Sequence, residues 1–194
     1  MTHATGDMYQ GEWHENSANG HGMFKTQVST YEGGWLNDQQ HGHGTEIIGE
    51  TSKYTGDYMF GKKEGNGRYE WEDGSWYEGE FVESKFHGEG KYYFAESERM
   101  YEGDFVNGVF EGHGKLIYKD GREYNGAFKN GQKHGNGNMK FPNGNQYTGN
   151  WRDDVQHGMG VLINAKEGNK RQGEWKNGKR VTWLGQPTKV IVQK

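Results

Sequence analysis

The sequence predicts an all-β fold, an elongated single-sheet solenoid of eight tandem antiparallel β-hairpins with a repeat of about 23 residues. Three observations predict it: a tyrosine-glycine-aromatic motif recurs at a regular interval, a glycine pair follows it at a constant distance, and apolar residues then alternate with polar ones. The chain is only 30% hydrophobic but 14% aromatic, with 34 glycines and 2 prolines. At this hydrophobic content a conventional apolar core is not expected. The net charge of -4 is too low for a solvated coil.

The first motif is Tyr-x-Gly-x-aromatic, and its first residue recurs at intervals of 22, 23, 23, 24, 23, 23 and 24 residues. These first residues are Tyr9, Tyr31, Tyr54, Tyr77, Tyr101, Tyr124, Tyr147 and, in the eighth copy, Arg171. We therefore expect a single array over residues 1–194, with repeats starting near 9, 31, 54, 77, 101, 124, 147 and 171. Residues 181–194 form a C-terminal cap or tail, in which Pro187 is expected to break strand pairing and Lys189–Lys194 is a candidate closing strand.

The second motif, x-Gly-x-Gly, starts ten residues after the tyrosine in each of the first seven copies, as at His87-Gly88. Turn formers such as Asn130-Gly131 lie between the two motifs and favour a tight hairpin turn. Beyond the second glycine the apolar residues alternate with polar ones, which is the period of a β-strand. Each repeat is therefore predicted to be strand, turn, strand.

The connection between repeats predicts the strand register. A three-residue loop with glycine last, as at residues 72–74, fits a type I turn closed by a left-handed glycine. That loop places Tyr69 opposite Tyr77 and Gly67 opposite Gly79, so the signature residues share one face.

The turn within a repeat is expected at Ser84 and Lys85, which would place Phe81 opposite Gly88. Each large ring then faces a glycine and lies over bare backbone. The other face is polar and takes the carboxylates Glu12, Asp57, Glu80 and Asp104.

Together these motifs resemble the MORN (membrane occupation and recognition nexus) repeat. The resemblance covers Tyr9 to about Trp175, with departures at Tyr58, Glu64 and Glu111 and in the degenerate eighth copy. It implies a β-solenoid that acts in protein-protein interaction, dimerisation and cytoskeletal or ciliary assembly, with phosphoinositide binding proposed for some members. Some relatives append such repeats to a catalytic domain, and no counterpart of that domain is expected here.

Histidines of the second motif invite a metal hypothesis. The equivalent residues are His41, His87, His134 and His157. Equivalent positions in neighbouring repeats lie about 10 Å apart, whereas ligands of one zinc ion lie within about 4 Å. His41 and His43 could chelate in principle, but a packing role beside the turn is favoured. Each Gly-x-Gly runs into a strand rather than a helix, so nucleotide binding is not expected. We expect no catalytic residue, metal or cofactor.

Residues that vary between repeats are better candidates for recognition. The central repeats carry extra large rings, and aromatic side chains are common anchors of interfaces. The candidate partner-binding residues are Trp71, Trp76, Tyr92, Tyr93, Phe94 and Phe110. We expect a helix or an extended peptide of a partner to bind there.

Charge is concentrated at the C-terminal end. Residues 164–194 carry a net charge of +6, which leaves -10 for the first 163 residues. The candidate basic site is Lys170, Arg171, Lys176, Lys179, Arg180 and Lys189. Two interpretations stay open: a soluble cap, or a contact with an acidic protein surface or anionic lipid.

The leading hypothesis is a non-enzymatic scaffold, a structural subunit of a cytoskeletal or ciliary assembly. Its partners are proteins, including neighbouring subunits or a second copy of the chain, and not nucleic acid. The alternative is a peripheral membrane adaptor that binds phosphoinositides through the basic end, at a gain of only about 1 kcal/mol per Lys or Arg. The chain has no cysteine and no apolar run as long as a membrane span, so a cytoplasmic location is expected.

Overall fold

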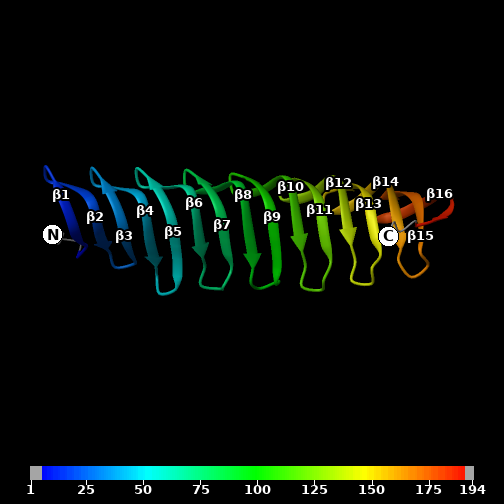
Figure 1. Ribbon diagram of the computed structural model, residues 1–194, viewed down its shortest axis with the longest axis horizontal. Coiled ribbons are helices and arrows are strands. Elements are labelled where there is room, and N and C mark those ends of the chain that lie inside the picture. The colour runs from blue at the N-terminus through cyan, green and yellow to red at the C-terminus, as the bar shows by residue number, and fades with distance from the viewer. Residues whose placement is uncertain (1–5, 191–194) are drawn as a thin grey trace. The chain divides into compact units, whose positions relative to one another are not determined.

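The computed structural model describes residues 6–190, and the chain divides into two compact units. Unit 1 ends at Glu96 and unit 2 begins at Ser97. The described residues form 16 β-strands and no helix (Figure 1), and hence no helix that could span a membrane. The all-β prediction of tandem antiparallel hairpins is confirmed, while the single domain over residues 1–194 stays a prediction.

Within each unit the strands are hydrogen-bonded in chain order, so each unit is by itself an antiparallel sheet of four hairpins. Unit 1 contains β1 (Met8–His14), β2 (Ser17–Lys25), β3 (Ser29–Leu36), β4 (Gln39–Ile48), β5 (Ser52–Met59), β6 (Lys62–Glu70), β7 (Trp76–Val82) and β8 (Lys85–Phe94). Unit 2 contains β9 (Arg99–Val106), β10 (Val109–Ile117), β11 (Glu123–Lys129), β12 (Gln132–Lys140), β13 (Gln146–Arg152), β14 (Val155–Asn164), β15 (Asn169–Lys176) and β16 (Lys179–Lys189).

The register between repeats is as predicted. Tyr69 pairs with Tyr77 and Gly67 with Gly79 across β6 and β7. In the connecting loop the Gly74 N–H donates to the carbonyl oxygen of Trp71 at 3.0 Å, and Gly74 has a φ of 83°. This is the type I turn closed by a left-handed glycine that the sequence indicates.

The turn within the repeat was predicted one residue too late. It consists of Glu83 and Ser84, with φ of 49° and 65°, as a two-residue type I′ turn requires. Phe81 therefore pairs with Phe86 rather than with Gly88. The expected pairing of this ring with a glycine on β8 is wrong.

A bulge restores the register farther along the same hairpin. Between Gly79 and Glu80 the ladder shifts, so that Gly88 and Glu89 bulge out of β8. Gly88 has a φ of 57°, which favours glycine at this position. The Glu80 carboxylate accepts a hydrogen bond from the Glu89 N–H at 3.2 Å. The same contact joins the N–H of His21 to Glu12 at 3.1 Å and the N–H of His113 to Asp104 at 2.7 Å.

Seven tyrosines, here called the ladder tyrosines, lie across the paired glycines of their repeats and define the tyrosine face of each sheet. Tyr54 is fully buried, and its hydroxyl donates to the carbonyl oxygen of Asp57 at 3.0 Å. A Cβ on Gly67 would lie 2.5 Å from that hydroxyl oxygen, so the ring needs a bare backbone beneath it. The same hydroxyl-to-carbonyl bond is made by Tyr9, Tyr31, Tyr77, Tyr101, Tyr124 and Tyr147.

The core is a row of these rings in edge-to-face contact. The Tyr54 centroid lies 5.2 Å from that of Tyr58 in its own repeat and 5.1 Å from that of Phe81 in the next, at interplanar angles of 88° and 81°. Such pairs contribute about 0.5–1.5 kcal/mol beyond the area that they bury. Within each unit, every repeat is thereby joined to the next through aromatic contacts.

Hydrogen bonds between successive turns join the repeats along one edge. The N–H of Ser84 donates to the Lys63 carbonyl oxygen at 2.9 Å, and that of Glu83 to the Glu64 carboxylate at 2.9 Å. The histidines of the second motif occupy the position of Glu64, and His41, His87 and His157 each have a buried Nδ1 without a hydrogen-bond partner. Among the described residues no group of three ligand-type side chains could hold a metal ion.

The prediction that Pro187 breaks strand pairing is confirmed, because residues 185–187 have no pairing partner on β15. The strand itself continues past the proline, which lies inside β16. The strand is the last of its sheet and its ladder is irregular between Lys170 and Gln172, which removes the need for a proline N–H. The expected closing strand Lys189–Lys194 falls mostly outside the described residues, although the Val190 N–H donates to the Gly168 carbonyl oxygen at 2.9 Å.

Burial raises the pKa values of the ladder tyrosines above that of a free tyrosine. Desolvation, followed by the nearby Glu46 carboxylate, raises the pKa of Tyr31 to about 12, and desolvation raises the pKa of Tyr147 to about 12. The pKa values of Tyr54, Tyr77 and Tyr101 are raised further, again mainly by burial.

We predict that the free energy of unfolding falls as the pH rises above 10. Unfolded tyrosines lose their proton near pH 10, whereas the folded ones keep it, so the stabilisation is complete below pH 10 and is lost toward about pH 12. Urea denaturation below and above pH 10 measures the slope, and Tyr31→Phe should make it shallower. An unchanged stability across this range would contradict the prediction.

A second prediction concerns the glycine beneath a tyrosine ring. In Gly90→Ala the new Cβ would lie 2.6 Å from the Tyr77 hydroxyl oxygen, so we expect a loss of about 1–3 kcal/mol in unfolding free energy by urea denaturation. The loss should be smaller in a Tyr77→Leu background, because the obstructing ring is gone. Equal losses in the two backgrounds would show that the ring is not the obstacle.

Candidate protein-binding surface

Five half-buried rings form a connected group on the tyrosine face of unit 1, here called the aromatic patch: Tyr69, Trp71, Phe86, Tyr92 and Phe94. The Trp71 centroid lies 4.6 Å from that of Tyr69 and 5.3 Å from that of Tyr92. The Tyr92 and Phe94 centroids are 4.4 Å apart. Three of the predicted binding residues, Trp71, Tyr92 and Phe94, are thus brought together.

Two connecting loops position the ends of this patch. The Trp71 N–H donates to the Ser75 carbonyl oxygen at 2.9 Å, which closes the first loop. The Ser75 hydroxyl donates to the Asp73 carboxylate at 2.9 Å and accepts from the Ala95 N–H at 3.1 Å. Because Ala95 follows Phe94, this bond joins the loop that carries Trp71 to the loop that follows β8.

Phe86 belongs to the patch although it is not among the residues that the sequence pattern singles out. Its ring stacks on the ladder tyrosine Tyr77 at 3.9 Å and 18°, and it meets Trp71 edge to face at 5.9 Å. The predicted turn position places Phe86 opposite Glu83 instead of opposite Phe81, and this conceals its contact with the ladder rings. The positive-φ turn at Glu83 and Ser84 was the missing signal.

Trp76 and Tyr93 lie on the opposite face of the same sheet. They are a cross-strand pair next to the pair of Tyr77 with Tyr92, and alternate residues of a strand face opposite sides. Their rings stack at 6.1 Å and 28°, and the Arg68 guanidinium lies 4.4 Å from the Trp76 centroid. These two residues therefore do not share a surface with the patch.

Phe110, the sixth predicted residue, lies in unit 2. It occupies the position of Phe86 in its own repeat and stacks on Tyr101 at 3.8 Å and 10°. The six residues are thus divided between two faces and two units.

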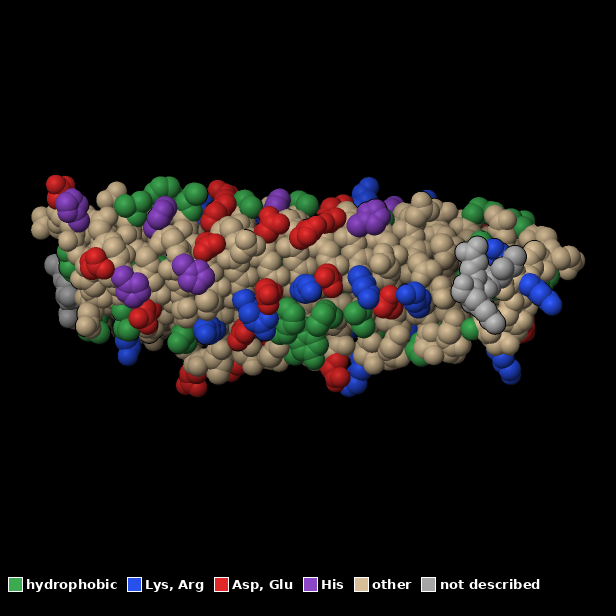
Figure 2. All heavy atoms as spheres, viewed as in Figure 1, with side chains coloured by type: hydrophobic (Ala, Val, Ile, Leu, Met, Phe, Trp, Pro, Cys, Tyr) green, Lys and Arg blue, Asp and Glu red, His purple; other side chains and the backbone are tan. Residues whose placement is uncertain are grey.

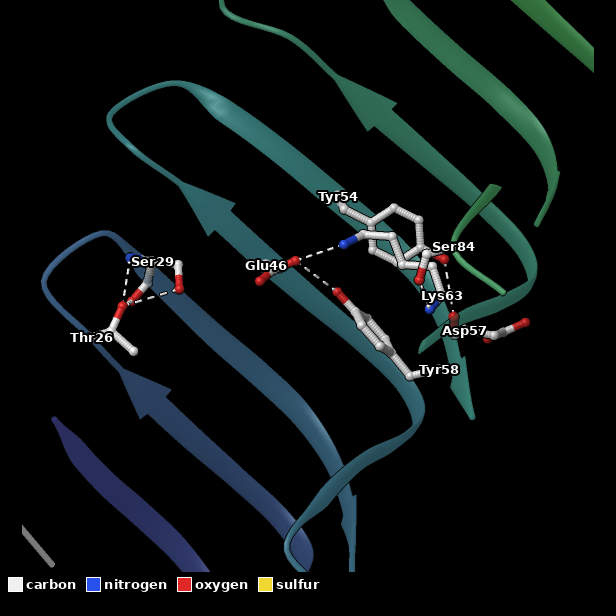
Figure 3. Close-up of polar contacts among 8 residues, drawn as sticks. All are labelled: Thr26, Ser29, Glu46, Tyr54, Asp57, Tyr58, Lys63 and Ser84. Carbon is white, nitrogen blue, oxygen red and sulfur yellow. Dashed lines mark hydrogen bonds and ion pairs between the residues drawn. The ribbon is translucent and has the colours of Figure 1, made fainter. Parts of the chain in front are cut away.

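An ion pair on the tyrosine face, drawn in Figure 3, lies next to Tyr69 of the patch. The Lys63 ammonium lies 2.8 Å from the Glu46 carboxylate, and the two side chains are 17% and 18% exposed. The same carboxylate accepts the Tyr58 hydroxyl at 3.2 Å, and the Lys63 nitrogen lies 4.9 Å from the Tyr54 centroid. It also lies 6.0 Å from the centroid of Tyr69, a member of the patch.

This ion pair also affects a neighbouring phenol. Burial raises the pKa of Tyr58, and the charge of Glu46 together with its hydrogen bond raises it further. Tyr58 therefore stays protonated and keeps donating to the carboxylate, while Lys63 takes the position that Phe86 occupies in the next repeat. The patch is charged at one boundary and apolar within.

Cations of the basic end are also divided between faces. Arg180 pairs with Trp175 on the tyrosine face, while Lys179 pairs with Lys176 one step along the ladder and so lies on the other. Lys170 precedes Arg171 and shares the face of Lys179. Lys189 ends β16, where it pairs with Asn169.

An open groove of about 320 Å³ lies beside Arg180 in unit 2. Its lining residues are Phe141, Asn143, Asn145, Gln156, Leu162, Trp175 and Arg180. The face of the molecule drawn in Figure 2 carries acidic and basic side chains in scattered positions.

Comparison with protein families finds the MORN repeat. The family model matches residues 9–26, 31–48, 54–76, 77–99, 101–121, 124–146, 147–166 and 172–181. No curated protein matches the chain. Among solved structures, the chain is similar to the SAS-4 (dCPAP) TCP domain of Drosophila melanogaster, solved in complex with a proline rich motif of Ana2 (dSTIL). The identity is 16%, the TM-score is 0.42, and the match covers 74% of this chain and 85% of that chain.

The matched segments follow the eight repeats in the same order as the hairpins of the two units. They take up most of the chain. The chain therefore belongs to the MORN repeat family, whose repeats generally serve as scaffolds for interactions with proteins or membranes.

Proposed function

We propose that the chain is a non-enzymatic scaffold and that the aromatic patch of unit 1 binds an apolar segment of a partner protein. One observation carries the proposal: five rings in mutual contact remain half-buried, although the ladder already supplies the rings that the fold needs. Clusters of large rings that remain partly accessible are common anchors of protein interfaces.

The ladder residues themselves are poor candidates for recognition. Tyr54 and Tyr77 are 0% exposed, so a partner cannot reach their rings without displacing the residues that stack on them. Trp71 and Phe94, in contrast, follow the end of β6 and close β8, where a helix or an extended peptide can lie across them. The ion pair of Lys63 with Glu46 adds a polar boundary that fixes the orientation of such a segment.

We also propose that the partner is a component of a cytoskeletal or ciliary assembly and that the protein acts in the cytoplasm. The resemblance to MORN repeats supports this proposal. A scaffold built from repeats, each with its own variable positions, can bind several neighbouring subunits at once.

The test is proximity labelling in the source cells with the full chain and with a Trp71→Ala plus Phe94→Ala variant. We expect the wild type to label a defined set of cytoskeletal or ciliary proteins, and the variant to lose part of that set because the patch has lost two of its five rings, including the one that contacts three others. A Trp76→Ala variant is the matched control, since it removes a large ring from the opposite face of the same sheet.

Equal loss in the patch variant and in the Trp76→Ala control would show that recognition does not depend on the patch. Circular dichroism of each variant checks that the sheet remains folded. A labelled set without cytoskeletal or ciliary proteins would overturn the proposed assembly while leaving the patch testable by direct binding.

A membrane adaptor is the second candidate, and the basic end favours it. The distribution of the charges argues against it, because Lys170, Lys176 and Lys179 face away from Arg171 and Arg180. A flat anionic surface can therefore contact only part of the net charge of +6, while the first 163 residues carry -10.

We predict that the full chain does not co-sediment with phosphoinositide-containing vesicles at physiological salt. Vesicles of neutral lipid alone are the control for nonspecific adsorption. Binding that needs phosphoinositide and disappears at high salt would establish the membrane adaptor instead.

A further inference from the structure

Two guanidinium groups and one indole ring form a stack at the end of unit 2. The Arg180 guanidinium lies 4.2 Å and that of Arg171 4.9 Å from the Trp183 centroid. The Arg171 Nε donates to the Gly185 carbonyl oxygen at 3.1 Å, which fixes that side chain. Within residues 6–190 the Arg180 guanidinium has no hydrogen-bond or ion-pair partner.

Stacking holds a guanidinium against a ring without using its in-plane donors. Arg180 is therefore a cation whose position is partly set by Trp183 and whose N–H groups are free to bind an acceptor. A guanidinium held in this way can bind a carboxylate, which accepts two parallel N–H hydrogen bonds from the planar group. Because the Arg180 side chain is already partly ordered, it loses less conformational entropy when the anion binds.

The groove beside Arg180 offers further donors, and none of its lining residues in the described part of the chain carries a carboxylate. The Asn143 side-chain oxygen accepts the Asn145 N–H at 3.0 Å, and the Asn145 side-chain oxygen accepts the Ala165 N–H at 3.0 Å. Their amide nitrogens are thus the groups that remain for a ligand. Phe141 and Leu162 supply apolar surface in the same groove.

We propose that this groove binds an extended peptide that carries an aspartate or glutamate next to an apolar residue. The carboxylate pairs with Arg180, and the apolar neighbour lies on Phe141 and Leu162. This site is separate from the aromatic patch of unit 1 and would give the scaffold a second, chemically different contact. Its failure would leave the proposed function of the patch intact.

A peptide carboxylate fits this groove better than a phosphorylated headgroup. Among the residues that the structure describes, Arg180 is the one cation that lines the groove, whereas sites for phosphate groups commonly gather several Arg or Lys side chains. A membrane surface would also need the nearby cations on one side, but Lys179 lies on the opposite face. The apolar residues Phe141 and Leu162 would make no favourable contact with an inorganic phosphate ion.

The test selects phage-displayed random heptapeptides on the immobilised full-length protein. Three forms are compared: the wild type, Arg180→Gln, and Lys179→Gln as a control. The control removes the same charge from the neighbouring residue on the other face. Circular dichroism establishes that all three are folded.

With the wild type and with Lys179→Gln, we expect acidic residues next to apolar ones to be enriched. With Arg180→Gln this enrichment should be lost. By calorimetry, a selected peptide should bind the wild-type protein about tenfold or more tightly than the same peptide with its acidic residue replaced by Gln. This difference in affinity should vanish in the Arg180→Gln protein. Equal enrichment in all three forms, or equal affinity for both peptides, would overturn the proposal. The proposal would also be overturned if phosphoinositide vesicles or inorganic phosphate bound in a manner that depends on Arg180 while no acidic peptide did.

Discussion

A tyrosine ring lying across two paired glycines is the interaction on which the rest of each sheet depends. Tyr54 fills the space over Gly56 and Gly67, and its hydroxyl reaches the carbonyl oxygen of Asp57 at 3.0 Å. The two glycines keep the backbones close, and the ring protects both from water. A sheet without a second layer thereby buries large side chains completely, which accounts for a stable fold at 30% hydrophobic residues.

Because the ladder is fixed, variation is concentrated where side chains stack on its outer surface. The ninth residue after each ladder tyrosine occupies this place: Ala18, Gln40, Lys63, Phe86, Phe110, Lys133 and Gln156. The ring of a ladder tyrosine can pack against another ring, as Tyr77 packs against Phe86, or against a cation, as Tyr54 packs against Lys63. The chemistry of the surface can therefore change from repeat to repeat without disturbing the fold.

Local patterns predicted the loop at Gly74 and the pairing of Tyr69 with Tyr77, since loop length and alternation determine them together. The bulge at Gly88 was not predicted, because it moves the register by two residues and leaves the alternation of faces unchanged. Phe86 was missed for that reason. Trp76 and Tyr93 were grouped with Trp71 by composition, although strand alternation alone places them on the other face.

The eighth repeat lacks the ladder tyrosine, and its end of the sheet is built differently. Arg171 replaces the tyrosine, and Trp183 pairs with Gly173 and covers that glycine from the opposite strand. Arg171 then lies over the indole instead of over the glycines, and Arg180 approaches the same ring. The first repeat keeps its tyrosine, Tyr9, and the signature tryptophan of that repeat, Trp13, is 46% exposed. The equivalent Trp175 of the eighth repeat is only 5% exposed, because it packs against the ring of Tyr147. The cation-indole stack is thus a direct consequence of ending the ladder, so the groove beside it can recognise an acid without any change to the repeats before it.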